Sequence, residues 1–181
     1  MTRNRHDQAA TIIGVVGGKK SGKTTTIEIL TRELNKRGYK VAVAKHIPES
    51  NFTIDTEGKD TWRYVQSGAK TVVAASAGEI ATIEKTRGLS LKEILQRCTD
   101  SDIVFLEGFR TLVAADKSIH KIIVAKSTED VEEAFEKFQP ILVLTGPYKP
   151  EKESTMIPYI DVLKHGSEIA DLVEKMAGKK R

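Results

Sequence analysis

The sequence has a single cysteine and no long apolar run. Cys98 alone cannot form an intramolecular disulfide or a zinc site built only from cysteines. No apolar run approaches the ~20 residues that cross a bilayer, and residues 1–10 lack the apolar middle region of a signal peptide. These absences lead us to expect a cytoplasmic protein with no membrane partner, in which Cys98 is a small, buried hydrophobic residue.

Aromatic residues are also few, at 6% of the chain, and they do not alternate with the basic residues as in a nucleic-acid face. The 29 Lys and Arg against 25 Asp and Glu give a net charge of +4, which permits an anionic ligand without selecting one. A chain of 181 residues suits one domain, with frayed ends expected at 1–10 and 178–181. We therefore expect a globular single domain that binds no nucleic acid.

Strands and helices are expected to alternate along the chain. Short apolar runs predict strands at 11–16, 41–44, 71–75, 80–83, 103–106, 121–125 and 141–144. Helical spacing and capping residues predict helices at 23–37, 60–67, 90–98, 129–138 and 167–176. This order predicts the α/β class, with a mainly parallel sheet that has helices on both sides. Residues 46–84 would form an inserted loop, helix and β-hairpin.

A phosphate-binding loop is expected directly after the first strand. The segment matches G-x-x-x-x-G-K-[ST], and its predicted nucleotide-binding residues are Gly17, Gly18, Lys19, Lys20, Ser21, Gly22, Lys23, Thr24 and Thr25. Glycines let backbone N–H groups surround a phosphate, and the N-terminus of the next helix adds attraction. Lys23 is expected to reach the β- and γ-phosphates, and the Thr24 hydroxyl to ligate Mg²⁺. The alternative is a glycine-rich turn without a ligand.

An acidic residue at the end of a second apolar strand would complete such a site. The strand predicted at 103–106 is followed by Glu107, which we expect to engage Mg²⁺ directly or through water. The alternative is a surface glutamate at a strand end. Asp102 begins the same strand, at the end away from the phosphates, and is expected to be structural.

Three further segments resemble one family. They are Lys45-His46, the run Asp55-x-x-Gly58-Lys59-Asp60-Thr61-x-Arg63 followed by Ser67-Gly68-Ala69, and Leu106-Glu107-Gly108-Phe109. In this order behind a phosphate loop, they resemble the molybdopterin-guanine dinucleotide biosynthesis adaptor protein B (MobB) family over residues 12–144.

The resemblance implies a GTP-binding protein with weak GTPase activity and with GTP and Mg²⁺ as cofactors. It would assist the nucleotidyltransferase that attaches GMP to molybdopterin in molybdenum cofactor biosynthesis. Family members are dimers of the phosphate-loop α/β class. The resemblance therefore implies a homodimer with a three-layer phosphate-loop NTPase fold, and that nucleotidyltransferase as its partner. Whether molybdopterin itself binds is left open.

The polar segment after the second strand supplies the remaining candidates. Asp55, with Lys23 and Glu107, completes the expected catalytic set, as an outer Mg²⁺ ligand or by orienting the attacking water. Lys59, Asp60 and Arg63 match the family's polar loop, where the two cations would hold phosphate oxygens. The alternative makes Asp60 a helix N-cap and Arg63 a solvated helix residue.

Two features depart from the pattern or leave it incomplete. Ile47-Pro48-Glu49-Ser50 replaces the run of His and Asp expected after Lys45-His46, which puts a metal role for that loop in doubt; His46 itself is either ligand-facing or structural. No Asn-Lys-x-Asp segment occurs, so guanine is not distinguished from adenine, although Tyr148 or Lys149 is placed to pack on a base.

Two other functions therefore stay open. One is an ATP-dependent small-molecule kinase or ligase that binds an anionic acceptor through Lys59 and Arg63. The other is a nucleotide-responsive adaptor without catalysis.

Overall fold

The computed structural model describes residues 10–86, 88, 90–150 and 157–178. Contacts divide the chain into two compact units. We call Met1–His46 with Leu91–Arg181 the sheet unit, and Ile47–Ser90 the insert unit. The predicted single domain stays a prediction, and the expected frayed ends fall almost entirely outside the described residues. Among those residues, no helix is both long and apolar enough to span a membrane.

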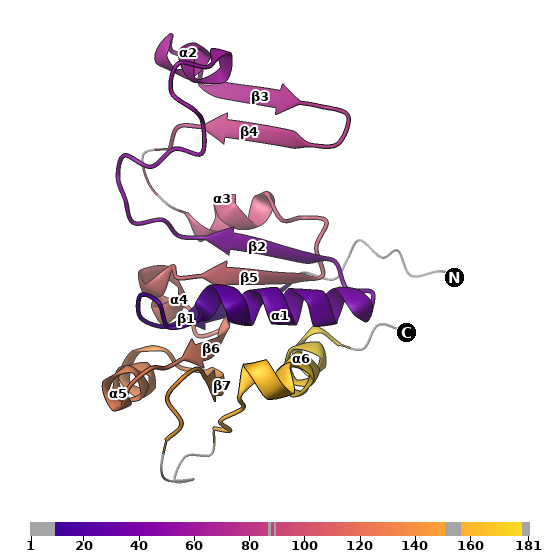
Figure 1. Cartoon of the computed structure of the whole chain (residues 1–181), viewed down its shortest axis with the longest axis vertical. Helices are drawn as coiled ribbons and strands as arrows, with labels where there is room; N and C mark the ends of the chain where they lie inside the picture. The colour runs from indigo at the N-terminus through magenta and orange to yellow at the C-terminus, as the bar shows by residue number, and fades with distance from the viewer. Residues whose placement is uncertain (1–9, 87, 89, 151–156, 179–181) are drawn as a thin grey trace. The chain divides into compact units, whose positions relative to one another are not determined.

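The sheet unit is built on five parallel strands in the order β2-β5-β1-β6-β7 (Figure 1). They are β1 (Thr11–Val16), β2 (Val41–Lys45), β5 (Ile103–Glu107), β6 (His120–Val124) and β7 (Ile141–Thr145). The three central strands are largely buried on both faces because helices cover both sides of the sheet. The expected parallel α/β sheet is confirmed.

Two helices cover one face of this sheet. They are α1 (Lys23–Lys36) and α6 (Val162–Ala177), which pack on each other and on the central strands. Leu30 and Leu34 of α1 are fully buried there, and each such leucine contributes about 1.5–3 kcal/mol relative to exposure. Gly166 of α6 lies against Ile29, where a Cβ would come within 2.5 Å of the isoleucine Cγ2. The helix after the phosphate loop is therefore fixed by the last helix of the chain.

The opposite face is covered by three shorter helices. They are α3 (Leu91–Gln96), α4 (Arg110–Ala115) and α5 (Thr128–Lys137). Ser127 caps α5 by accepting a hydrogen bond from the Asp130 backbone N–H. Cys98 is half-buried beside α3, and burial raises the pKa of its thiol.

Two elements differ from the sequence prediction. Helix α4 has no predicted counterpart, and α6 begins at Val162 rather than at residue 167. Asp161 caps α6 through the Leu163 backbone N–H, and the non-helical backbone of His165 then interrupts the helical pattern. Regular helical spacing therefore does not reveal the first turn of α6.

The insert unit consists of one helix and a hairpin. Helix α2 (Asp60–Gln66) packs on β3 (Thr71–Ala75), which pairs with β4 (Ile80–Glu84) in antiparallel register. The hairpin closes through a hydrogen bond from the Ser76 backbone N–H to the Glu79 carbonyl, 2.8 Å long. The inserted helix and hairpin expected from the sequence are present.

Candidate functional site

The loop between β1 and α1 adopts a conformation that favours glycine. Gly22 has φ 103° and Lys20 has φ 60°, both in the left-handed region. Gly17 lies so close to β6 that a Cβ there would be 2.3 Å from the Val124 carbonyl oxygen. Ser21 is buried, and its hydroxyl has no partner among the described residues. The loop is a tight backbone cradle at the carboxyl end of β1.

Lys23, the first residue of α1, points back over this loop. Its ammonium donates a 2.7 Å hydrogen bond to the Gly18 carbonyl. Burial lowers the pKa of Lys23, nearby cations lower it further, and the Glu107 carboxylate opposes them. An anion in the loop would offset this unfavourable environment, as a phosphate would.

Thr24 and Glu107 meet beneath the loop. The Thr24 hydroxyl lies 3.1 Å and 3.3 Å from the two Glu107 carboxylate oxygens and donates to them. Glu107 is the last residue of β5 and only 7% exposed, which excludes the surface-glutamate alternative. The structure thus brings together Thr24 and Glu107, two of the three residues that the sequence predicts as Mg²⁺ ligands.

Lys45 is a third member of this cluster, and the sequence alone assigns it no role. It ends β2 in register with Glu107 at the end of β5, and its Nζ lies 3.0 Å from Oε1 of the glutamate. The available signal is a charged residue ending each of two apolar strands. Their pairing depends on strand order, which the sequence does not specify.

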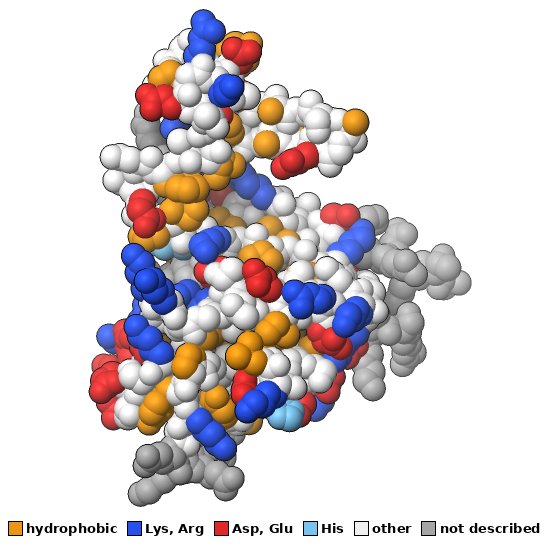
Figure 2. All heavy atoms as spheres, viewed as in Figure 1, with side chains coloured by type: hydrophobic (Ala, Val, Ile, Leu, Met, Phe, Trp, Pro, Cys, Tyr) orange, Lys and Arg blue, Asp and Glu red, His pale blue; other side chains and the backbone are white. Residues whose placement is uncertain are grey.

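The electrostatic environment of the loop is basic. The cations that lower the Lys23 pKa are Lys45, Arg110 and Lys126. Lys126 also donates to the Lys19 carbonyl at 3.4 Å. Figure 2 shows Lys and Arg side chains gathered on the side where the loop before α1 lies. Part of the positive charge is therefore concentrated around the loop before α1.

The loop after β7 runs beside the end of β6. Gly146, with φ 109°, lies so near Ala125 that a Cβ would be 2.4 Å from the alanine carbonyl oxygen. The Tyr148 backbone N–H donates to the same carbonyl, and its hydroxyl accepts a 2.8 Å hydrogen bond from Thr128. Tyr148 is thus held against α5, and its predicted packing on a base stays a prediction, as does that of Lys149.

His46 has a structural environment. Its ring lies 5.4 Å from that of Phe109, and its backbone N–H donates to the Glu107 carbonyl at 2.9 Å. Phe109 has φ 44°, a strained conformation for a residue with a Cβ. The His46 contacts therefore support the turn that presents Glu107, which favours the structural alternative.

Asp55 lies in the insert unit. One carboxylate oxygen, Oδ1, accepts hydrogen bonds from the Thr56 backbone N–H at 2.9 Å and the Thr61 hydroxyl at 2.8 Å. The other, Oδ2, is buried and has no partner among the described residues. These contacts tie Asp55 to the start of α2, and its expected role toward Mg²⁺ stays a prediction.

Lys59, Asp60 and Arg63 lie at the beginning of α2 and belong to the insert unit as well. Lys59 occupies the N-cap position, so the alternative that made Asp60 the N-cap is wrong. Arg63 and Asp60 form an exposed ion pair at 3.7 Å, a geometry of little energetic weight. Their expected contacts with phosphate stay predictions. Within the described ranges, no group of three or more His, Cys, Asp or Glu is arranged to hold a metal.

Comparisons with known proteins match the chain over the same region. A family model described as "Molybdopterin guanine dinucleotide synthesis protein B" matches residues 12–145. A Haemophilus influenzae protein called "Molybdopterin-guanine dinucleotide biosynthesis adapter protein" is 30% identical over 166 residues, covering 90% of this chain and 87% of that protein. The residues matched by the family model include the phosphate loop, the insert unit and β5.

Two further matches agree with these. A Methanocaldococcus jannaschii protein called "Putative molybdopterin-guanine dinucleotide biosynthesis adapter protein" is 37% identical over 120 residues, covering 65% of this chain and 48% of that protein. The crystal structure of Bacillus subtilis MobB superposes with a TM-score of 0.72 at 25% identity, covering 94% of this chain and 99% of that one. Sequence and fold therefore point to the same relatives.

Proposed function

This chain belongs to the molybdopterin guanine dinucleotide synthesis protein B (MobB) family, and on that premise we propose that it is an adapter in molybdopterin guanine dinucleotide biosynthesis. It binds GTP with Mg²⁺, hydrolyses it slowly, and assists the nucleotidyltransferase that attaches GMP to molybdopterin. It works in the cytoplasm as a homodimer. The observation that carries the proposal is the contact between Thr24 and Glu107 beneath the phosphate loop.

The residues of the phosphate loop fit the binding of a nucleoside triphosphate. Lys23, with its ammonium over the loop, would hold the β- and γ-phosphates, while backbone N–H groups between Gly17 and Gly22 would surround one of them. The unpartnered Ser21 hydroxyl leaves a donor in the cradle. These features support a bound anion rather than a glycine-rich turn without a ligand.

The residues also fit Mg²⁺, which prefers oxygen ligands. The Thr24 hydroxyl and the Glu107 carboxylate supply them, and Mg²⁺, when bound, neutralises charge on the phosphate oxygens. In the structure, the Glu107 carboxylate forms an ion pair with the Lys45 ammonium. Lys45 would leave that oxygen when the metal binds and stay near the phosphates as a cation.

Slow hydrolysis is expected because of the residue types near the phosphate loop. Fast phosphate-loop hydrolases use a glutamine to orient water and an arginine to stabilise charge. In the described part of the sheet unit, Gln96 ends α3 and Gln139 precedes β7, so neither stands at a carboxyl end of a strand. We therefore propose that Arg110 and the lysines near the loop bind charge without aligning water.

The test is competition of GTP against ATP for the purified protein, with and without the nucleotidyltransferase and molybdopterin. We expect the protein to bind GTP more tightly than ATP. The difference in affinity should increase when the nucleotidyltransferase and molybdopterin are present. Transfer of ³²P from [γ-³²P]ATP to an acceptor would instead identify the kinase or ligase alternative. Nucleotide binding without phosphate release, with partner affinity unchanged by Glu107→Gln, would identify the non-catalytic adaptor. Equal affinity for both nucleotides in every mixture would contradict the proposed GTP specificity.

A further inference from the structure

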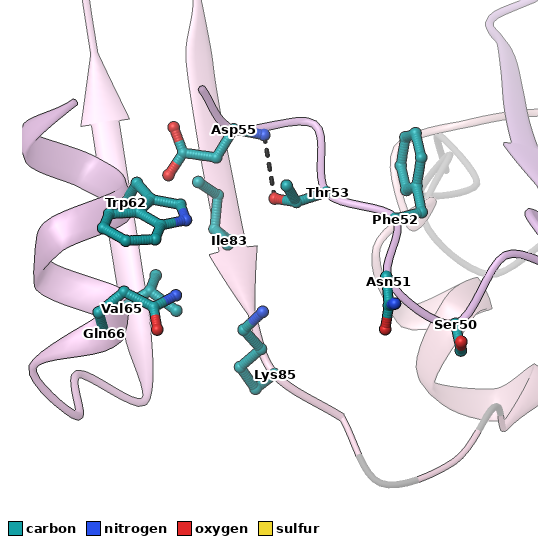
Figure 3. Close-up of a pocket in the computed structure, with 10 residues that line it drawn as sticks. All are labelled: Ser50, Asn51, Phe52, Thr53, Asp55, Trp62, Val65, Gln66, Ile83 and Lys85. Atoms are coloured by element: carbon teal, nitrogen blue, oxygen red, sulfur yellow. Dashed lines mark hydrogen bonds between the residues drawn. The ribbon is translucent and has the colours of Figure 1, made fainter. Parts of the chain in front are cut away.

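A cavity of about 280 Å³ lies wholly within the insert unit, between α2, β4 and the loop that leads into α2 (Figure 3). Its walls combine aromatic rings, amides, one carboxylate and one ammonium. The residues concerned are Asn51, Phe52, Asp55, Trp62, Gln66 and Lys85. Ligand pockets span roughly 300–1,000 Å³, so this one suits a single bicyclic ring and is too small for a dinucleotide.

Asp55 supplies the polar anchor of this cavity. Its Oδ1 is already engaged by Thr56 and Thr61, whereas the buried Oδ2 has no donor among the described residues. A buried carboxylate oxygen without a donor is unfavourable, and a ligand that brings an N–H group removes the cost. The cavity therefore favours a ligand with N–H donors on its edge.

Trp62 and Phe52 supply apolar surface on opposite sides of the cavity. The indole of Trp62 projects from α2 toward Ile83 of β4, and the Phe52 ring comes from the loop (Figure 3). Phe52 is 50% exposed, so part of its ring is open to a ligand. Flat rings stack favourably on such side chains.

Amide and ammonium groups complete the cavity. Gln66 ends α2 and Asn51 lies in the loop, so amide N–H groups are available to a ring carbonyl. The Lys85 ammonium points into the gap between β4 and the loop (Figure 3). An ammonium at this edge suits a phosphate attached to the ring.

We propose that this cavity binds the 2-amino-4-oxo-pyrimidine ring shared by pterins and guanine, with a phosphate near Lys85. The ring N–H and its exocyclic amino group form a donor edge that faces Asp55 Oδ2, and Trp62 stacks on the ring. The inference rests on the proposed function, because molybdopterin guanine dinucleotide contains both ring systems. Asp55 then serves ring recognition in the insert unit rather than Mg²⁺ binding.

Trp62 makes the proposal directly measurable, since it is the only tryptophan of the chain. The experiment titrates the full chain carrying Lys23→Ala, which disables the phosphate loop, and follows tryptophan emission with calorimetry alongside. The probes are neopterin monophosphate, GMP and AMP. We expect saturable binding of neopterin monophosphate or GMP at least tenfold tighter than that of AMP, which lacks the donor edge. The tighter of the first two identifies the source of the ring.

Variants assign the binding to the cavity. Asp55→Asn keeps one acceptor oxygen for Thr56 and Thr61 and places an amide NH₂ donor where Oδ2 stood, so we expect at least tenfold weaker binding. Glu57→Gln removes a charge from the same loop at an exposed residue outside the cavity, and its affinity should match the parent. Gln66→Ala and Lys85→Ala alter exposed cavity residues, and each should weaken binding several-fold even if Asp55→Asn does not fold.

The two proposals can fail separately. GTP binding by the unsubstituted chain tests the phosphate loop, whereas the probes in the Lys23→Ala background test the cavity. If the unsubstituted chain does not bind GTP but the Lys23→Ala chain binds neopterin monophosphate, only the proposed function is overturned. Equal binding of AMP, no binding of any probe, or undiminished binding in Gln66→Ala, Lys85→Ala and a folded Asp55→Asn would overturn the ring site.

Discussion

Lys45 and Glu107 stand opposite each other at the carboxyl ends of β2 and β5, with the lysine Nζ 3.0 Å from Oε1 of the glutamate. The Glu107 side chain is only 9% exposed and the Lys45 side chain 52% exposed, so the buried carboxylate is held by a cation that can move into solvent. In the proposed site, the ammonium therefore competes with Mg²⁺ for one oxygen.

Lys45→Met should lower the Mg²⁺ concentration needed for half-maximal nucleotide binding, by up to about fivefold, because a half-exposed ion pair contributes up to ~1 kcal/mol. Fluorescent GTP titrated at several Mg²⁺ concentrations measures the effect. The matched control is Lys40→Met, which removes the exposed pair with Asp100 and should leave the Mg²⁺ requirement unchanged. A higher Mg²⁺ requirement in Lys45→Met would show that the lysine assists the metal instead.

Lys23→Ala should weaken GTP binding on the order of 100-fold, since it removes charge-assisted hydrogen bonds to phosphate. The fold should persist, because burial disfavours the charged ammonium and lowers the pKa of Lys23, so removing it also removes a desolvation cost. Calorimetry with GTP and urea unfolding measure the two effects. Lys36→Ala, at the exposed last turn of α1, serves as the control. Unchanged GTP affinity in Lys23→Ala would remove the phosphate loop from the site.

Gly17→Ala should both destabilise the protein and abolish nucleotide binding. Its new Cβ would meet the Val124 carbonyl at 2.3 Å, so either β1 or β6 must shift at a cost of about 1–3 kcal/mol or more. Gly78→Ala provides the comparison, because no atom lies within 4 Å of the position its new methyl group would take and its φ is not in the left-handed region. Equal stability of the two variants in urea would contradict the close approach.

Stability at alkaline pH should depend on Lys121. This lysine is fully buried, donates to the Asp116 and Gln139 carbonyls, and has a pKa that burial lowers. The folded state therefore binds fewer protons than the unfolded state between the lowered pKa and 10.5, so this contribution to stability rises with pH.

The measurement compares urea unfolding of the wild type and Lys121→Met from pH 7 to about 10.5. The free energy of unfolding of the wild type should increase relative to that of the variant across this range. The raised pKa values of Cys98 and Tyr159 act in the opposite direction, but they are common to both proteins and cancel in the difference. A difference that stays constant with pH would refute the assignment.

The elements that could be predicted from the sequence are those whose pattern is local. The strand at 11–16 and the hairpin strand at 71–75 have the predicted bounds, because apolar β-branched runs and flanking turn residues define them. Helix α4 escapes prediction because it has six residues and begins after Phe109, whose left-handed backbone carries no sequence signal comparable to a glycine. Periodicity does not identify short helices that are held by tertiary packing.

The residues of the candidate site also divide into those that a local motif predicts and those that only the fold brings together. Lys23 and Thr24 lie within one motif, so their role could be predicted from spacing. The role of Lys45 could not be predicted in this way. The insert unit separates Lys45 from Glu107 in the sequence, and only the placement of β2 beside β5 brings the two residues together. Strand order results from the packing of the whole sheet and is not written in either strand alone.

The burial of β5 has a consequence for how variants of this protein should be interpreted. Ile103–Glu107 is buried along its whole length, and the same strand ends in the acid of the proposed site. A substitution at Phe105 that disturbs packing would therefore also displace Glu107. Mutational scans scored by cellular growth will merge folding defects with functional ones along this strand, and only affinities normalised to the fraction of folded protein will separate them.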